Sequence, residues 1–464
     1  MGRPGRLGEL KASGYRPRSV REELRANLIA RIRAKQPLFP EMIGYADSVV
    51  PAIESAILAG HDMIFLGERG QGKSKMIRRI VELLDDVVPI IAGSEINDDP
   101  CAPISRYGRD RVEKEGDATP IAWIERDSRY GEKLATPDVS IADLIGEIDP
   151  IRVAEGRYLA DESTIHYGLI PRTNRGVFCI NELPDLAEKV QVGLFNVMEE
   201  RDFQVKGFKV RLPLDVVVVA SANPEDYTRR GRIITPLKDR YQAQIRTHYP
   251  PTRQLEIDVM KQERRVPRTQ SVPLWIPGFL EQIVAELTIQ ARKSPDISQV
   301  SGVSVRASIA NYETLLASAE RRALRLGEAE AVPRLTDLPG LRASMGGKIE
   351  LEYAGTDKTE SEILDNLVRC AVIEVFTELC SAFDLDAVVR AFEDGWKVEV
   401  GAELPATEYA DGVDNIAGLR KAVEQLGCGS SPARIAAGVE FVLEGLHLSN
   451  KLNRETSGDR VVYG

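Results

Sequence analysis

Residues 67–74 read Gly67-Glu68-Arg69-Gly70-Gln71-Gly72-Lys73-Ser74, and they decide the fold of this 464-residue chain. They match the phosphate-binding loop pattern G-x-x-x-x-G-K-[ST] at every position. The apolar run 63–66 before the loop suits a buried strand, and residues 75–84 after it have the apolar spacing of a helix. A strand, a glycine-rich turn and a helix direct backbone N–H groups and the positive helix end at one point, which suits phosphate.

This loop predicts a nucleotide-binding site to which all eight of its residues contribute. Lys73 would reach the β and γ phosphates, and the hydroxyl of Ser74 would ligate Mg²⁺. The dinucleotide pattern G-x-G-x-x-G is absent, because the glycines here run G-x-x-G-x-G. The loop therefore indicates a protein that binds a nucleoside triphosphate.

A second motif, Gly176-Val-Phe-Cys-Ile-Asn181-Glu182, has four apolar residues that end in a carboxylate. Such a run makes a buried parallel strand that carries an acid to its C-terminal edge, where α/β sheets bind ligands. Beside a phosphate loop it looks like a Walker B element, with Glu182 placed to polarise the attacking water. Asn181 replaces the usual aspartate as a magnesium residue. It accepts hydrogen bonds but brings no charge, so we expect weaker metal binding with catalysis retained. The alternative is a strand that ends in a solvated turn.

Two further segments continue the catalytic pattern. The apolar run 216–221 ends in Ala-Asn223-Pro, and an amide at that strand end, near Glu182, suits a sensor of the γ-phosphate. Taken alone, Asn-Pro more often marks only a turn. Several arginines follow at 228–232 and 237–241, and one placed against a neighbour's γ-phosphate would act as an arginine finger.

Composition excludes several classes of protein. The net charge of −10 argues against a nucleic-acid binder as a whole, although residues 1–40 carry ten Lys/Arg against three Asp/Glu. The five cysteines form no CxxC pair and the four histidines are dispersed, so neither a zinc site nor a disulfide framework is predicted. The longest aliphatic run, 216–220, is too short to cross a bilayer, and no secretory signal is visible. We expect a cytoplasmic protein without a membrane span.

The rest of the chain is interpreted from periodicity and turn residues. Residues 1–18 are expected to be flexible, and Ser19 and Glu22 form a capping-box pattern that predicts a helix to Lys35, packed on its own domain. Predicted strands and loops are a strand at 87–91, a strand at 121–124, an irregular insertion at 138–175, a basic hairpin at 203–212, a strand at 348–353 and a frayed tail from 449. Predicted helices are 183–200, 252–263, 277–293, 306–326, 361–386 and 432–448, with a weaker one at 413–426.

With these pieces in order, the sequence resembles an AAA+ ATPase of the branch that holds the magnesium chelatase I subunit and the MoxR-type ATPases. The resemblance covers about residues 38–325 and rests on segments 141–149, 174–182, 221–225 and 237–241 and the hairpin before the sensor strand. It implies an α/β P-loop fold, a parallel sheet flanked by helices, followed by a helical lid and a helical C-terminal region. The expected divisions are a basic extension with one helix at 1–37, the nucleotide domain at 38–250, the lid at 251–330 and a mainly helical region at 331–464.

The same resemblance implies Mg²⁺-dependent ATP hydrolysis by a hexameric ring that remodels, or inserts metal into, a partner protein carrying a von Willebrand factor A domain. It makes Arg240 the arginine finger, and Arg306, in Ser-Val-Arg306-Ala, the second sensor. Asn181 departs from the family's aspartate, which keeps open a slowly hydrolysing scaffold. A magnesium chelatase motor for porphyrin and an enhancer-type transcription activator also stay open, although the G-A-F-T-G-A loop of the activator class is absent. The hairpin, with Lys206, Lys209 and Arg211, and the insertion are the expected working surface toward the client or the ring pore. The alternative is a hairpin that only packs against its neighbour, with the three charges solvated.

Overall fold

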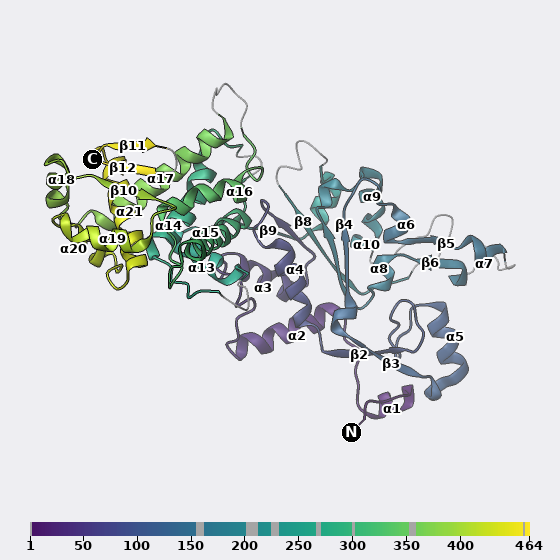
Figure 1. The fold of residues 1–464 in the computed structure, drawn as a ribbon. Coiled ribbons are helices and arrows are strands. Elements are labelled where there is room, and N and C mark those ends of the chain that lie inside the picture. Colours follow the sequence, from purple (N-terminus) through teal and green to yellow (C-terminus); the bar gives the residue numbers. More distant parts are fainter. Residues whose placement is uncertain are drawn as a thin grey trace. The chain divides into compact units, whose positions relative to one another are not determined.

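The computed structural model describes residues 2–154, 162–200, 212–223, 232–265, 271–298, 302–351, 359–457 and 460–464. The chain divides into two units, Met1–His248 and Tyr249–Gly464 (Figure 1). The sequence predicts four regions, with boundaries after residues 37, 250 and 330. This division into two units does not test all of those boundaries, which stay predictions.

Five parallel strands form the central sheet of the first unit, in the order β4-β7-β8-β1-β9. Figure 1 labels three of them, β4, β8 and β9. The five strands are β1 (Met63–Leu66), β4 (Tyr130–Leu134), β7 (Gly176–Asn181), β8 (Val216–Ala222) and β9 (Ala243–Arg246). Because they run the same way, the segments that follow β1, β7 and β8 leave from one edge of the sheet. The predicted fold class, a parallel sheet flanked by helices, is confirmed.

Two apolar cores cover the two faces of this sheet, because successive strand residues point to opposite faces. On β8, Val217 and Val219 belong to one core, whereas Val216 and Val218 belong to the other. The first core is shared with α2 (Val20–Arg33), α3 (Val49–Ala59) and α4 (Lys73–Ile80). The second is shared with α6 (Ile141–Leu144), α8 (Leu169–Arg172), α9 (Glu188–Gly193), α10 (Phe195–Glu199) and α12 (Thr235–Arg240). Burial on both faces explains why β7 and β8 are continuous apolar runs.

Short antiparallel pairs lie outside the central sheet. They are β2 (Val87–Ile91) with β3 (Ile121–Glu125), and β5 (Gly146–Ile148) with β6 (Ile165–Tyr167). The strands predicted at 87–91 and 121–124 are thus confirmed, but they pair with each other, and β4 takes the place beside β7. The predicted insertion at 138–175 holds short elements as expected, including α7 (Pro150–Ala154). The helix predicted over 183–200 is broken into a turn of 3₁₀ helix followed by α9 and α10. The predicted hairpin lies outside the described residues, apart from Leu212, as do the arginines at 228–231.

The N-terminal residues 2–18 are ordered, so the expectation of a flexible segment was wrong. Helix α1 (Leu7–Ala12) buries Leu7 and Leu10 against Ile121 of β3. The indole Nε1 of Trp123 donates a hydrogen bond to the carbonyl oxygen of Pro4 at 2.9 Å. The N-terminal segment packs here because the β2–β3 pair would otherwise expose apolar side chains, which α1 covers. Helix α5 (Arg106–Glu115) lies in the connection between these two strands.

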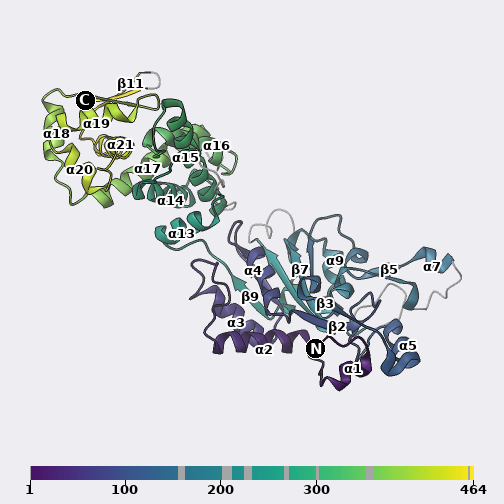
Figure 2. The ribbon, with the colours of Figure 1, turned by 60° about the horizontal axis from the view of Figure 1, so that its bottom comes forward.

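Helix α2 begins where the capping-box pattern predicts. The backbone N–H of Glu22 donates to Ser19 Oγ at 3.3 Å, and the backbone N–H of Ser19 donates to the Glu22 carboxylate at 2.8 Å. The helix lies beside α3 (Figure 2) and belongs to its own unit's core. Its Glu23 is buried and receives two hydrogen bonds from the buried Arg129, at 2.8 and 2.6 Å. This ion pair fixes α2 to the start of the segment that leads into β4.

Replacing Glu23 with alanine is expected to lower the free energy of unfolding of the first unit by about 3–5 kcal/mol, because the buried Arg129 guanidinium loses its counter-charge. Calorimetry of the full chain would measure this as a lower melting temperature for the first unit. Glu22→Ala is the matched control, since it removes an exposed carboxylate from the same helix and should lower the melting temperature far less. Equal effects of the two variants would contradict the assignment.

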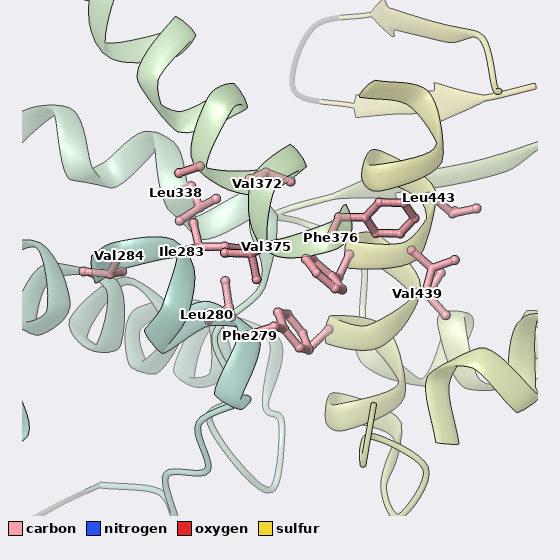
Figure 3. Close-up of a cluster of buried hydrophobic side chains, with 14 of the residues drawn as sticks. Phe279, Leu280, Ile283, Val284, Leu338, Val372, Val375, Phe376, Val439 and Leu443 are labelled. Atoms are coloured by element: carbon pink, nitrogen blue, oxygen red, sulfur yellow. The ribbon is translucent and has the colours of Figure 1, made fainter. Parts of the chain in front are cut away.

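The second unit is mainly helical. Its helices are α13 (Arg253–Glu263), α14 (Gly278–Lys293), α15 (Val305–Leu326), α16 (Leu341–Met345), α17 (Glu360–Cys380), α18 (Asp386–Glu393), α19 (Ala406–Gly412), α20 (Leu419–Gln425) and α21 (Pro432–Leu448). One core joins them, and Figure 3 shows side chains of α14, α17 and α21 converging in it. The rings of Phe279 and Phe441 stack there with centroids 4.2 Å apart. The predicted long helices are confirmed, except that α17 ends at Cys380.

A three-stranded antiparallel sheet completes the second unit, and it contradicts the expectation of a frayed tail. Its strands are β10 (Val398–Gly401), β11 (Arg454–Ser457) and β12 (Arg460–Tyr463), in the order β10-β12-β11. Tyr463 is buried, and its hydroxyl donates a hydrogen bond to Glu444. The polar appearance of these residues misled because a few side chains, Leu452, Arg454 and Tyr463, attach the segment to the core and to Glu444. The strand predicted at 348–353 was also wrong within the described residues, where only an isolated bridge between Ile297 and Leu351 forms.

Candidate active site

The phosphate loop connects β1 to α4 and depends on its glycines. Gly70 and Gly72 have φ angles of +78° and +73°, in the left-handed region that glycine adopts without steric cost. A Cβ atom on Gly67 would lie 1.9 Å from Thr247 Oγ1 and 2.2 Å from Gln71 Oε1. The loop therefore closes against the residue that follows β9, and its backbone has the tight curvature that a phosphate cradle requires.

Two polar contacts that the sequence did not predict hold this loop in place. The side-chain oxygen of Gln71 accepts a hydrogen bond from Thr247 Oγ1 at 2.6 Å. The hydroxyl of Tyr45 lies 2.7 Å from the carbonyl oxygens of both Gln71 and His248 and donates to one at a time. Burial raises the pKa of Tyr45 above its ordinary value, so the hydroxyl keeps its proton. These contacts tie the loop directly to Thr247, 176 positions away in sequence, and through Tyr45 to His248.

Lys73, Asn223 and Glu182, which were predicted from three separate motifs, lie in one hydrogen-bonded chain. The buried Nζ of Lys73 donates to Asn223 Oδ1 at 2.7 Å, to the carbonyl oxygen of Glu68 at 2.8 Å and to that of Gly67. The Nδ2 of Asn223 donates to Glu182 Oε2 at 2.9 Å. Asn223 therefore bridges the lysine of the loop and the carboxylate at the end of β7.

Glu182 has an unusual backbone conformation. Its φ and ψ are +55° and +47°, in the left-handed region, which costs a residue with a side chain on the order of 1–3 kcal/mol. Its N–H donates to Ser221 Oγ on β8 at 3.1 Å. This turn directs the carboxylate toward Asn223 at the neighbouring strand end. Strain of this kind occurs often at functional sites, and it accords with the predicted role of Glu182.

The residues predicted to hold Mg²⁺ offer oxygen atoms side by side. Ser74 Oγ lies 3.4 Å from Asn181 Oδ1, which also accepts a hydrogen bond from Ser221 Oγ at 3.1 Å. Within the part of the chain that the structure describes, no group of three or more His, Cys, Asp or Glu side chains could hold a metal. Hydroxyl and amide oxygens fit Mg²⁺, which usually takes few protein ligands and relies on phosphate oxygens and water for the rest.

A carboxylate missed by sequence analysis, Glu132 on β4, lies directly against Asn181. Its Oε1 accepts a hydrogen bond from Asn181 Nδ2. Arg78 of α4 donates to both of its oxygens at 3.0 Å, and the Tyr130 hydroxyl donates to Oε2 at 3.0 Å. Partial burial raises the pKa of Glu132, but the hydrogen bonds from Arg78 and Tyr130 outweigh it and bring the pKa below the ordinary value. No local motif marks this residue, since its partner lies 49 positions away.

The two predicted arginines belong to different units of the chain. Arg240 ends α12, where its guanidinium lies 4.4 Å from the ring centroid of Phe195, donates to the carbonyl oxygen of Pro236 at 2.7 Å and pairs with Glu199. These contacts are with α10 and α12 and not with the phosphate loop. Arg306 belongs to the second unit, near the start of α15, where its side chain is exposed.

Comparison with known proteins shows what this chain is similar to. Residues 153–241 match the family model described as the sigma-54 interaction domain. The magnesium-chelatase subunit ChlI of Anabaena variabilis is 26% identical over 239 residues, covering 50% of this chain and 64% of that protein. The chloroplastic subunit ChlI-1 of Arabidopsis thaliana is 28% identical over 196 residues, 40% of this chain and 42% of that protein. The chain is a member of the AAA+ ATPase family. It spans less than two thirds of the length of these two curated relatives.

Solved structures with similar folds include the complex between subunits BchI and BchD of magnesium chelatase, based on a cryo-EM reconstruction. It is 19% identical, covering 68% of this AAA+ protein and 97% of that chain, with a TM-score of 0.36. NtrX from Brucella abortus in complex with ATP is 13% identical and covers 77% and 67% of the two chains, with a TM-score of 0.39. No helix among the described residues of this AAA+ protein is long and apolar enough to cross a membrane. Its five cysteines all lie in described segments and are free.

Proposed function

We propose that this AAA+ protein hydrolyses ATP with Mg²⁺ and uses the energy to remodel, or to insert metal into, a partner protein. The observation that carries the proposal is the bridge by which Asn223 joins Lys73 to Glu182. The amide of Asn223 thereby connects the lysine that would bind phosphate to the carboxylate that would activate water. It can therefore sense whether the γ-phosphate is present. This arrangement suits hydrolysis better than simple nucleotide storage.

The residues divide the chemistry between them. Lys73 exchanges its carbonyl and amide partners for β and γ phosphate oxygens. Ser74 and Asn181 would hold Mg²⁺, which would supply neutralisation of the charge on the phosphate oxygens. Glu182, positioned by Asn223, orients and deprotonates the attacking water. Arg240 of a neighbouring subunit stabilises the transition state, and Arg306 acts as the second sensor.

Replacing Lys73 with alanine is expected to weaken ATP binding about 30-fold or more, equivalent to about 2 kcal/mol, because a charge-assisted phosphate contact is lost. Titration of a fluorescent ATP analogue into the purified chain measures this directly. Arg79→Ala is the matched control, since it removes a positive charge from the same helix at an exposed pair with Glu41 and Glu82. Equal ATP affinity of the wild-type and Lys73→Ala proteins would overturn the proposed site.

Assembly and partner are proposed from the family. The I subunit of magnesium chelatase forms a complex with a second subunit in a solved assembly, BchI with BchD. We propose a hexameric ring for this protein, with a von Willebrand factor A protein as its partner. Porphyrin metallation is a narrower version of the same proposal, and it requires the remaining chelatase subunits to support metal insertion with this chain.

A transcription-activator function is the second candidate, favoured by the match of residues 153–241 to the sigma-54 interaction domain. Against it stands the absence of a G-A-F-T-G-A sequence anywhere in the chain. Binding of purified sigma-54 to the nucleotide-bound protein would distinguish the two functions, since a chelatase-type motor is not expected to bind it.

A further inference from the structure

The magnesium side of the site contains an asparagine whose two side-chain atoms are chemically opposite. The amide oxygen of Asn181 can accept a hydrogen bond or ligate a cation, whereas its NH₂ group can only donate. An aspartate would present an oxygen in either orientation, but an asparagine serves a cation only when it is turned the right way. Something must therefore determine which atom of Asn181 lies toward Ser74.

We propose that Glu132 is a positioning residue that holds the amide oxygen of Asn181 toward Ser74, so that the two residues together replace the usual magnesium-site aspartate. The inference rests on the proposed function and names one further residue of the same site. It follows from the contacts of Asn181, whose Nδ2 donates to Glu132 Oε1, while Oδ1 lies 3.1 Å from Ser221 Oγ and 3.4 Å from Ser74 Oγ.

A carboxylate is well suited to this task because an ionised carboxylate only accepts hydrogen bonds. Turning the amide over would place its oxygen against the oxygen of Glu132, which is unfavourable. Glu132 is itself held in place by Arg78, with two contacts of 3.0 Å, and by Tyr130 at 3.0 Å. The side chain of Arg78 is 62% exposed and that of Glu132 only 24%, so the arginine braces the carboxylate from the solvent side.

The proposal predicts that the effect of Glu132→Gln depends on residue 181. In the wild-type background, glutamine can donate as well as accept, so Asn181 is free to turn over. Mg²⁺ is expected to increase the affinity of the protein for a fluorescent ADP analogue. In the Glu132→Gln protein, the Mg²⁺ concentration that gives half of this increase should rise about tenfold, the equivalent of about 1.4 kcal/mol. In an Asn181→Asp background the same change should have no effect or lower that concentration, because aspartate has no wrong orientation and glutamine donates to it.

Binding is measured without turnover, in the full chain, with and without EDTA. Nucleotide affinity in EDTA should not change, and Glu82→Gln, which breaks the analogous pair with Arg79, should leave the Mg²⁺ response unaltered. An equal effect of Glu132→Gln in both backgrounds would assign Glu132 a structural role only, and no effect in the wild-type background would also overturn the inference. Failure of the wild-type protein to bind ADP at all would instead overturn the proposed function, and the inference with it.

Discussion

Replacing Arg240 with alanine is expected to reduce ATP turnover roughly 10³–10⁵-fold, the range known for arginine fingers, while ATP affinity stays within about threefold. In its own chain Arg240 contacts Phe195, Pro236 and Glu199, and none of these belongs to the phosphate loop. An arginine that stabilises the transition state of a neighbouring subunit contributes little to ground-state binding, so the loss should fall on the rate. Steady-state phosphate release and nucleotide titration on the same preparation separate the two quantities.

Mixing two inactive variants tests whether the site is completed by a neighbour. Arg240→Ala subunits keep an intact Glu182, and Glu182→Gln subunits keep an intact Arg240, so some interfaces of a mixed ring contain both groups. Partial recovery of turnover is expected in mixtures shown to co-assemble. Lys238→Ala serves as the control, because it removes a positive charge from the same helix and should remain active. If mixtures that co-assemble stay inactive, Arg240 does not act between subunits.

The second large effect is expected at Glu182. Glu182→Gln should lower turnover about 10²–10⁴-fold, the usual contribution of a general base, with ATP still bound. Glutamine retains an oxygen that can accept the hydrogen bond from Asn223, but it cannot take a proton from water. Single-turnover hydrolysis alongside ATP binding distinguishes these effects, and Glu188→Gln, at an exposed carboxylate on α9, should be neutral. A Glu182→Gln protein with normal turnover would show that the base lies elsewhere.

The central strands of the sheet could be predicted from the sequence because each is marked by a local pattern, a continuous apolar run. Strands β1, β7 and β8 are apolar runs buried on both faces, and each ends in residues of the site. Parallel strands deliver their C-terminal ends to one edge, so the meeting of Lys73, Glu182 and Asn223 could be expected from the sequence alone.

The edges of the fold were harder to predict, because edge strands are only partly buried. In β4 every residue is at least partly exposed, and β9 has a single buried residue, Ile245, so neither has a continuous apolar run. Missing β4 also meant missing Glu132, which reaches the site only through the pairing of β4 with β7. The roles expected of Arg240 and Arg306 remain predictions. They depend on how subunits and units are arranged around the nucleotide, which the local contacts of one subunit do not determine.

The order of strands in the small sheet has a consequence for synthesis on the ribosome. Strand β10 ends at Gly401, but β12, its neighbour in the sheet, begins at Arg460, about sixty residues later. At the usual elongation rate of 5–20 residues per second, β10 waits roughly 3–12 s for that partner. During this interval the first unit can already be folded, while the second presents an open strand edge of the kind that pairs with other chains. The nascent protein should therefore be most vulnerable to aggregation, and most dependent on chaperones, in the interval between the synthesis of β10 and that of β12.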